Sequence, residues 1–144
     1  MREILFRGKR AENGKWVEGV YFKHDTVCIC FSSDDPKPSH LIIQDGFCDW
    51  GFEPPIQGIE VIPETIGQYT GLTDKNGKKI FEGDIVKGSN IMHSNRKIYQ
   101  VAFDDGAFEL FDHKGVGWHH SHIDNKEVIG NIHDNPELLK GERK

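Results

Sequence analysis

The sequence has few cysteines and no long apolar run, and both absences exclude whole classes of protein. Its 144 residues include three cysteines, Cys28, Cys30 and Cys48, an odd number that does not suit a disulfide framework. No stretch approaches the roughly 18 apolar residues that indicate a transmembrane helix. The apolar residues 4–6 lie between charged residues and are too few for the core of a signal peptide. We therefore expect a cytoplasmic protein that does not associate with a membrane.

The sequence also lacks an excess of basic residues. It carries 18 Lys and Arg against 23 Asp and Glu, for a formal net charge of -5. Residues 1–62 hold 7 basic and 10 acidic residues, and residues 63–144 hold 11 and 13. Neither part has the basic surplus with which proteins bind phosphate backbones. Nucleic-acid binding is therefore disfavoured, although a local basic patch is still compatible with these counts.

No part of the sequence has apolar residues at the spacing of an amphipathic helix. Apolar residues recur at spacing two in short runs separated by Gly, Asn and Asp, which predicts an all-β protein of short antiparallel strands. The predicted strands are residues 3–11, 16–23, 26–31, 41–43, 59–62, 85–87 and 127–132, with others near residues 80, 100 and 110. A short helical turn is predicted at residues 136–139, where proline occupies the first position.

Three turn pairs determine the predicted strand pairing: Asn13-Gly14, Asn76-Gly77 and Asp105-Gly106. Such pairs readily adopt the two positive φ angles of a type I′ turn, which makes a two-residue hairpin loop. The resulting partners are Lys9 with Glu18, Phe6 with Tyr21, Asp74 with Lys79, Leu72 with Phe81, Phe103 with Phe108, and Val101 with Leu110. Several of these pairs are aromatic or oppositely charged, as a favourable register requires.

The strand count predicts two regions and a tail. Residues 1–62 are predicted to form an N-terminal β-sheet region, and residues 63–139 have the number and spacing of strands of an SH3-like barrel. Residues 140–144 are predicted to be a frayed tail.

The segment "ETIGQYTGLTDKNGKKIFEGDIV", residues 64–86, is rich in glycine and turn pairs, which we interpret as structural. Its polar residues Gln68, Tyr69 and Thr70 are candidates for an interaction surface, together with Trp118. A glycine-flanked tyrosine suits an interface. It suits equally well a corner in which its hydroxyl bonds a buried carbonyl, and we prefer that interpretation.

Two clusters raise the question of a metal. In "WHHSHID", a strand would place His120, His122 and Asp124 on one face, where they could share an ion. Cys28 and Cys30 could likewise supply half a zinc site. The alternatives are a solvated histidine loop and two small buried cysteines. None of the established ligand spacings is present, so we predict neither a metal nor another cofactor.

The sequence also contains no motif of a known catalytic class. The context of a nucleophile elbow or of a catalytic cysteine is missing. The glycine-rich segment is not followed by a helix that could aim amide groups at a phosphate. We therefore predict that the protein is not an enzyme and has no catalytic residues.

Four segments of the sequence resemble those of the YopX family, whose members are small proteins carried by phages and prophages. They are "ENGKWVEG", "ETIGQYTGLTDKNGKKIFEGDIV", "VAFDDGAFEL" and "EVIGNIHDNPELL", and they occur in the family's order along nearly the whole chain. The resemblance implies an all-β protein with an SH3-like barrel in its C-terminal half. It implies no biochemical activity, so it transfers no catalytic or metal residue to this sequence.

Two hypotheses about function follow. The first is a non-enzymatic binding or assembly module of phage or prophage origin, which binds a protein partner or self-associates through open sheet edges. The alternative is a nucleic-acid-binding barrel serving phage replication or expression. The alternative requires basic side chains to converge beside Trp118 or Tyr69: Lys75, Lys78, Lys79, Arg96 and Lys97.

Overall fold

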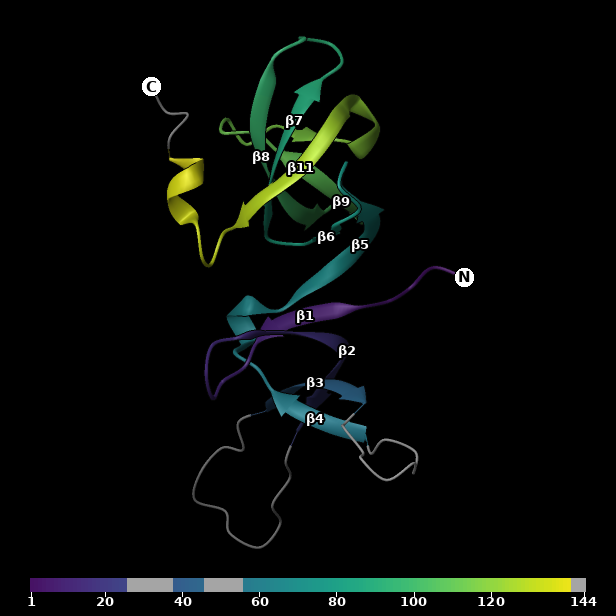
Figure 1. Cartoon of the computed structure of the whole chain (residues 1–144), viewed down its shortest axis with the longest axis vertical. Coiled ribbons are helices and arrows are strands. Elements are labelled where there is room, and N and C mark those ends of the chain that lie inside the picture. Colours follow the sequence, from purple (N-terminus) through teal and green to yellow (C-terminus); the bar gives the residue numbers. More distant parts are fainter. Residues whose placement is uncertain (26–37, 46–55, 141–144) are drawn as a thin grey trace, which may run out of the picture. The chain divides into compact units, whose positions relative to one another are not determined.

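The computed structural model describes residues 1–25, 38–45 and 56–140, and all of its strand pairs are antiparallel (Figure 1). The described helices are three short 3-10 turns: η1 (Pro63–Thr65), η2 (His120–His122) and η3 (Pro136–Leu139). The all-β prediction is confirmed, and so is a helical turn at residues 136–139. None of the described helices is long and apolar enough to cross a membrane.

Some sequence predictions fall outside the described residues. These are the strand 26–31, the three cysteines Cys28, Cys30 and Cys48, and all of the predicted tail except Lys140.

The chain divides into two compact units. One unit is Glu3–Gln68, and the other is Tyr69–Lys144 together with Met1–Arg2. Strand β5 (Gly67–Thr73) begins in the first unit and continues in the second.

The first unit is built on the strand order β4-β3-β2-β1. Its strands are β1 (Phe6–Lys9), β2 (Trp16–His24), β3 (Ser39–Asp45) and β4 (Ile56–Glu60), and β1 also pairs with the first residues of β5. Alternation along the strands sends one set of apolar side chains into a small core: Val17, Ile42, Ile59 and Val61. Strand β4 lies at the end of this order (Figure 1). Its outer edge meets residues 10–11 at one end, where Ala11 N–H donates to the Glu60 carbonyl and Arg10 forms a bridge with Val61.

The second unit contains a five-stranded sheet in the order β10-β9-β8-β7-β11. Its strands are β7 (Asp84–Asn90), β8 (Arg96–Asp104), β9 (Ala107–Phe111), β10 (Gly117–Trp118) and β11 (Ile123–Asn131). The short strand β6 (Lys79–Phe81) pairs with β5. The buried core comes from β6 and from four strands of the sheet: Ile80, Val86, Tyr99, Val101, Leu110 and Ile123.

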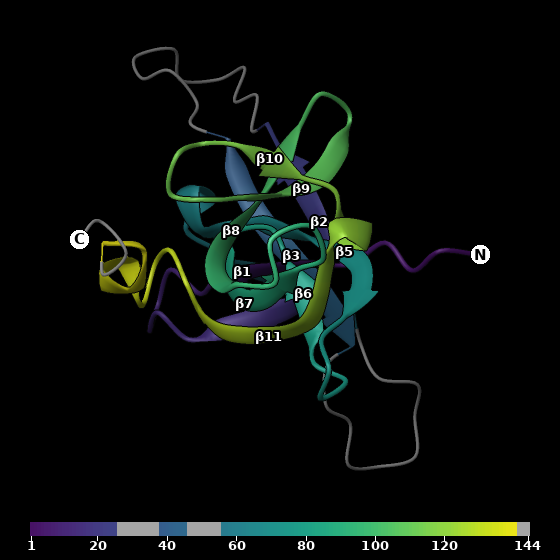
Figure 2. The ribbon, with the colours of Figure 1, turned by 90° about the horizontal axis from the view of Figure 1, so that it is seen from above.

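This sheet is curved but open. Figure 2 shows the curvature of β8 and β11. Across the described residues the outer strands β10 and β11 do not pair with each other, so the predicted closed SH3-like barrel is not what the strand pairing forms. The physical reason is local: β10 has two residues, and the η2 turn separates it from β11.

The Asp105-Gly106 hairpin forms as predicted. Both residues have positive φ, 45° and 81°, as a type I′ turn requires. The predicted partners follow from that turn: Phe103 lies opposite Phe108 and Val101 opposite Leu110.

The two Asn-Gly hairpins differ from the prediction, because only their glycines have positive φ. At the first, Arg10 N–H donates to the Lys15 carbonyl at 2.9 Å, which makes a four-residue loop. The register therefore moves by two residues, with Lys9 opposite Trp16 and Phe6 opposite Gly19. A shift of two keeps each side chain on its predicted face.

The second Asn-Gly hairpin closes through Asp74 rather than through a type I′ turn. Asp74 N–H donates to the Lys78 carbonyl at 2.8 Å, and Gly77 N–H donates to the Asp74 carbonyl at 3.0 Å. This is a three-residue loop with glycine in the left-handed position. Lys79 consequently lies opposite Thr73, and Phe81 lies opposite Tyr69.

Candidate functional site

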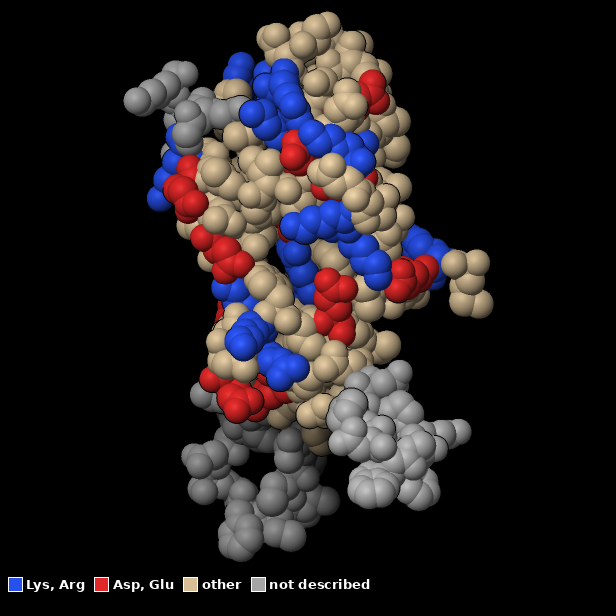
Figure 3. Space-filling model, in the orientation of Figure 1, with Lys and Arg blue, Asp and Glu red and all other residues tan. Residues whose placement is uncertain are grey.

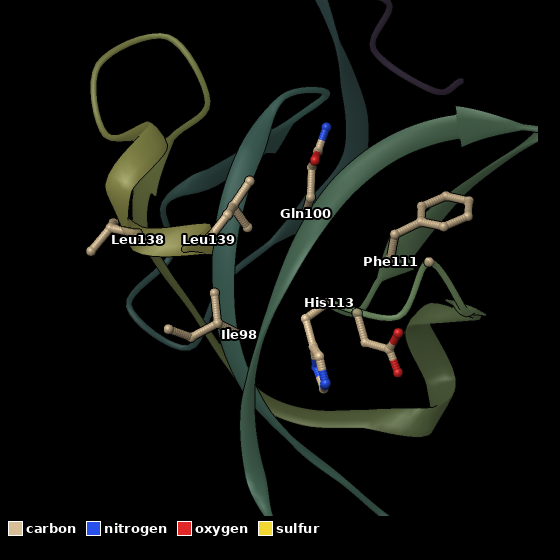
Figure 4. A pocket seen from close by; sticks show the side chains of 8 residues that line it. Ile98, Gln100, Phe111, His113, Leu138 and Leu139 are labelled. Atoms are coloured by element: carbon tan, nitrogen blue, oxygen red, sulfur yellow. The ribbon is translucent and has the colours of Figure 1, made fainter. Parts of the chain in front are cut away.

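A pocket of about 270 Å³ lies in the second unit between β8 and the η3 turn (Figure 4). We call it the β8–η3 groove, and its lining residues are Ile98, Gln100, Phe111, Asp112, His113, Gly115, Leu138 and Leu139. Figure 4 shows Ile98 and the two leucines along one side of the groove and Phe111 along the other. The groove therefore has apolar walls and a few polar groups.

Strand alternation explains why Ile98 and Gln100 of β8 face the groove. Tyr99 and Val101 are 1% and 0% exposed in the core, so Ile98 and Gln100 lie on the opposite face of the strand. This face of the sheet contacts η3, which contributes Leu138 and Leu139.

The turn before η3 is fixed by Asn131. Its side-chain oxygen accepts hydrogen bonds from His133 N–H at 3.0 Å and Asp134 N–H at 2.9 Å, and its backbone carbonyl accepts one from Asn135 N–H at 2.8 Å. Gly130 is also required, because a Cβ there would lie 2.6 Å from the side-chain oxygen of Asn135. The turn directs the chain back toward β8 and forms one wall of the groove.

The acidic group of the groove, Asp112, is held by its own loop. Its carboxylate accepts hydrogen bonds from Lys114 N–H at 2.9 Å, Val116 N–H at 3.0 Å and Trp118 Nε1–H at 3.4 Å. Burial raises the pKa of Asp112, but the two backbone hydrogen bonds and the indole outweigh it and leave the pKa below its ordinary value. The carboxylate is therefore ionised at neutral pH and shapes the loop.

The predicted interaction residues of β5 serve the fold. Tyr69 is 9% exposed, its ring centroid lies 5.6 Å from that of Phe81, and Lys79 Nζ lies 5.4 Å from the ring. Thr70 Oγ1 donates to the Ile80 carbonyl at 2.9 Å, which ties β5 to β6. Gln68 is half-buried, and its backbone pairs with Phe6. The structure does not bring these three residues together with Trp118 as one described pocket.

Trp118 is half-buried against the core and lies in a row of aromatic rings. Its ring centroid is 6.0 Å from that of His93 and 6.4 Å from that of His122, both edge-on. His119 continues the row at 6.2 Å from His122. Trp118 thus contacts the Asp112 loop through its nitrogen and the histidines through its ring.

The three metal candidates do not share one strand face as assumed from the sequence. His120 and His122 belong to the η2 turn, whereas Asp124 lies in β11 opposite Ser89. His120 is 8% exposed, but His122 and Asp124 are exposed. Within the described part of the chain, no three His, Cys, Asp or Glu side chains gather as a metal-binding group.

His120 is the unusual member of this cluster. Both of its ring nitrogens are buried and have no hydrogen-bond partner among the described residues. Burial, followed by the nearby charges of Lys126 and His119, lowers the pKa of His120 from 6.5 to about 4. The ring is therefore neutral at physiological pH, and it contributes a buried polar group without a bonding partner.

Basic side chains converge only in part. Lys75 Nζ and Arg96 Nη2 lie 2.7 and 3.1 Å from Glu127 Oε2, and Lys87 lies opposite Glu127 across the β7–β11 ladder. The hydrogen bond from Lys75, its charge and the charge of Arg96 hold the pKa of Glu127 below its ordinary value. Figure 3 shows Lys and Arg side chains spread over the visible face of this unit. Of the five basic residues named from the sequence, Lys75 and Arg96 meet at this carboxylate, whereas Lys79 lies over the ring of the buried Tyr69.

The β8–η3 groove has no counterpart among the features predicted from the sequence. Its walls come from segments about 40 residues apart, and no local motif joins Ile98 to Leu139. The available signal was the pair Leu138-Leu139 after Asn135-Pro136, two apolar residues near a chain end that is otherwise polar.

A curated relative of this chain carries no stated activity in its name. Part of a curated relative, the "SPbeta prophage-derived uncharacterized protein YopX" of Bacillus subtilis (strain 168), is 35% identical to this chain over 74 residues. That match covers 45% of this chain and 53% of the relative, so the chain spans about half the length of the curated relative that it matches.

A solved structure and a family model extend over far more of the chain. The crystal structure of protein EF1440 from Enterococcus faecalis is 25% identical and similar over 96% of this chain and 99% of that one, with a TM-score of 0.52. The family model described as YopX protein matches residues 5–140. The chain therefore belongs to the YopX family.

Proposed function

We propose that this chain is a non-enzymatic binding module of prophage origin, and that its β8–η3 groove receives an apolar side chain of a protein partner. The prophage origin is inferred from the name of the Bacillus subtilis relative. The observation that carries the proposal is the groove itself, in which four apolar residues surround a pocket of about 270 Å³.

The size of the groove favours a side chain over a cofactor. Pockets for small-molecule ligands usually measure about 300 to 1,000 Å³, so this one is at or below the lower limit. A leucine or an aromatic side chain needs less room and gains free energy mainly by leaving water. A protein segment would add main-chain contacts at the open ends.

The chemistry of the groove favours binding over catalysis. In the part of the chain that the structure describes, its lining contains no Ser, Thr, Cys, Lys or Tyr that could act as a nucleophile, and its polar side chains are those of Gln100, Asp112 and His113. Asp112 already accepts three hydrogen bonds, and its lowered pKa makes it a poor proton acceptor at neutral pH.

Selection from a displayed library of random peptides tests this function. We expect enrichment of sequences with a leucine, phenylalanine or tryptophan at one position, and loss of that enrichment in Ile98→Glu. Phe103→Glu is the matched control, because Phe103 is an exposed β8 residue outside the groove. Retained thermal stability of both variants checks their folding. An absence of any enriched motif, or equal selection by Ile98→Glu, contradicts the proposal.

A second function, binding of nucleic acid, is favoured by one observation. Lys75, Lys87 and Arg96 surround the single carboxylate of Glu127, which leaves local positive charge. Tyr69 is too buried to stack on a base, so contacts with phosphates would dominate. Titration of labelled single- and double-stranded DNA and RNA at low salt tests it. No binding at micromolar protein excludes this function.

A further inference from the structure

The exposed edge of β4 has open backbone groups at two positions. Val61 N–H donates to the His40 carbonyl, so the odd-numbered residues of β4 direct their backbone groups toward β3. The even-numbered residues, Ile56, Gly58 and Glu60, direct theirs away from β3. Glu60 is partly used, because its carbonyl accepts a hydrogen bond from Ala11 N–H at 2.9 Å. Among the residues that the structure describes, none pairs with the outward backbone groups of Ile56 and Gly58.

Gly58 is a glycine that the fold does not require. A Cβ at this position would meet only Leu41 Cδ1 at 3.5 Å, an ordinary contact, and φ lies outside the left-handed region. Gly19, in β2 of the same sheet, differs because a Cβ there would collide with the Ile43 carbonyl. A glycine weakens a strand, and in a strand interior it often marks a bulge, a bend or a place where a ligand or another backbone approaches closely.

The missing side chain at Gly58 leaves space on this face of the sheet, and the residue that could fill the same space in a partner copy lies two positions away in β4. Ile56 is 78% exposed, and alternation places its side chain on the same face of the sheet as Gly58. Ile43 lies opposite Gly58 across the β3–β4 ladder and belongs to that face too. A pocket of about 480 Å³ borders this edge, lined by Gln57, Gly58 and the loop residues 10–12 among others.

We propose that β4 is a self-association site, where a second copy of this chain adds its own β4 in antiparallel orientation. Pairing about a twofold axis at Gln57 places Ile56 of each copy opposite Gly58 of the other. This register joins residues whose backbone groups both point outward, and it forms four hydrogen bonds. Each exposed isoleucine then covers the glycine gap of the partner.

The neighbouring register that pairs Gly58 with Gly58 fits less well. A shift that places Gly58 opposite Gly58 also places Ile56 opposite Glu60, whose carbonyl already binds Ala11. The edge therefore favours one short ladder over open-ended growth of the sheet.

The surface is distinct from the β8–η3 groove, so this inference does not rest on the proposed function. The two surfaces belong to different units and share no residue. Loss of peptide selection with retained self-association, or the reverse, shows which proposal fails.

Sedimentation equilibrium of the full chain over a range of protein concentrations tests the association. We expect a reversible monomer–dimer equilibrium, whose dissociation constant rises about tenfold or more in Ile56→Lys. Met92→Lys is the matched control, since Met92 is 70% exposed and lies in the other unit. It should leave the constant within about twofold, as rim or remote substitutions do. A monomer at the highest concentration reached, or equal effects of the two variants, overturns the proposal.

Cysteine cross-linking tests the register. Gln57→Cys should form an intermolecular 57–57 disulfide on mild oxidation, because paired residues of this kind have Cα atoms about 4.5 Å apart. Glu60→Cys should not, since its two copies would lie about 20 Å apart at about 3.3 Å per residue. Mass spectrometry identifies the linked peptides against the native cysteines. Cross-linking at Glu60, or none at Gln57, contradicts the register.

Discussion

The carboxylate of Asp74 accepts a hydrogen bond from Val128 N–H at 3.0 Å, across 54 residues of sequence. Its other oxygen accepts hydrogen bonds from Asn76 N–H at 2.8 Å and Lys78 N–H at 2.9 Å. One side chain therefore closes the hairpin before β6 and attaches it to β11 beside the irregularity between Asp124 and Glu127. Because Asp74 is 8% exposed, no water can easily replace these bonds.

Asp74→Asn should lower the free energy of unfolding by about 1 to 3 kcal/mol, since an amide can accept through only one oxygen and leaves a buried N–H unpaired. Urea unfolding at pH 7 measures the change. Asp104→Asn is the control, because Asp104 is exposed and its side chain forms no ion pair or hydrogen bond within the described ranges 1–25, 38–45 and 56–140. Equal stability of the Asp74 variant and wild type contradicts the role of this residue.

The same carboxylate predicts a loss of stability in acid. Burial raises the pKa of Asp74, but hydrogen bonds from Val128, Lys78 and Asn76 and the charge of Lys78 leave it below the ordinary 3.8. A carboxyl whose folded pKa is depressed stabilises the protein above its unfolded pKa, and this contribution fades as the pH falls through the folded value. Unfolding experiments below pH 4 should show this loss in wild type and a smaller one in Asp74→Asn.

Because of His120, the protein should also lose folding stability at a milder acidic pH. Its folded pKa of about 4 is below the ordinary 6.5, so the unfolded chain binds more protons between these values. Stability should therefore fall as the pH is lowered from 6.5 toward 4, by about 3 kcal/mol at most at 1.36 kcal/mol per pKa unit. His120→Phe removes this dependence and should raise stability at pH 5.

The matched control for His120 is His122→Phe, because His122 is exposed on the same turn. NMR titration of the imidazole C–H signals gives the pKa of His120 directly. A value near 6.5, or the same acid dependence in His120→Phe and wild type, contradicts the burial argument.

Any residue with a Cβ at the second position of the Asp105-Gly106 turn should make the folded protein less stable. Gly106 has φ of 81°, and Gly106→Ala should lower stability by about 1 to 2 kcal/mol, the usual penalty for a left-handed backbone. Thermal unfolding measures it. A Cβ there would meet no heavy atom within 4 Å, so a steric clash cannot account for the loss. Unchanged stability means that the turn tolerates another geometry.

Gly58→Ala should increase the thermal stability of the protein, whereas Gly106→Ala should decrease it. Its φ is ordinary and the Cβ has room, so the substitution should raise stability by about 0.5 to 1 kcal/mol through a lower entropy of the unfolded chain. Dilute protein keeps self-association out of the measurement. A destabilised variant means that the fold itself needs this glycine, which removes one argument for the β4 interface.

Sequence reasoning succeeded where one residue pair decides the geometry. Asp105 and Gly106 both tolerate positive φ, and their short loop gave the correct partners for Phe103 and Val101. It failed at Asn13-Gly14 and Asn76-Gly77, because longer loops also place glycine in the left-handed position. The choice there depends on contacts made after the chain folds, such as those of the Asp74 carboxylate.

The candidate site was less accessible to such reasoning. Aromatic and histidine residues attracted attention, yet Tyr69 is buried and His120 faces the interior. Ile98 and Leu139 carry no local signal, because their significance arises only when η3 lies against β8. Binding surfaces assembled from distant apolar residues are in general visible only in the folded chain.

The most direct test of the binding proposal is an NMR titration of the ¹⁵N-labelled full chain with N-acetyl-leucinamide, N-acetyl-tryptophanamide and N-acetyl-lysinamide. We expect saturable shifts with the two apolar probes at the amides of Ile98, Gln100, Phe111 and Leu139, and none with the lysine probe. Shifts that do not saturate, or that occur only outside the β8–η3 groove, contradict the account.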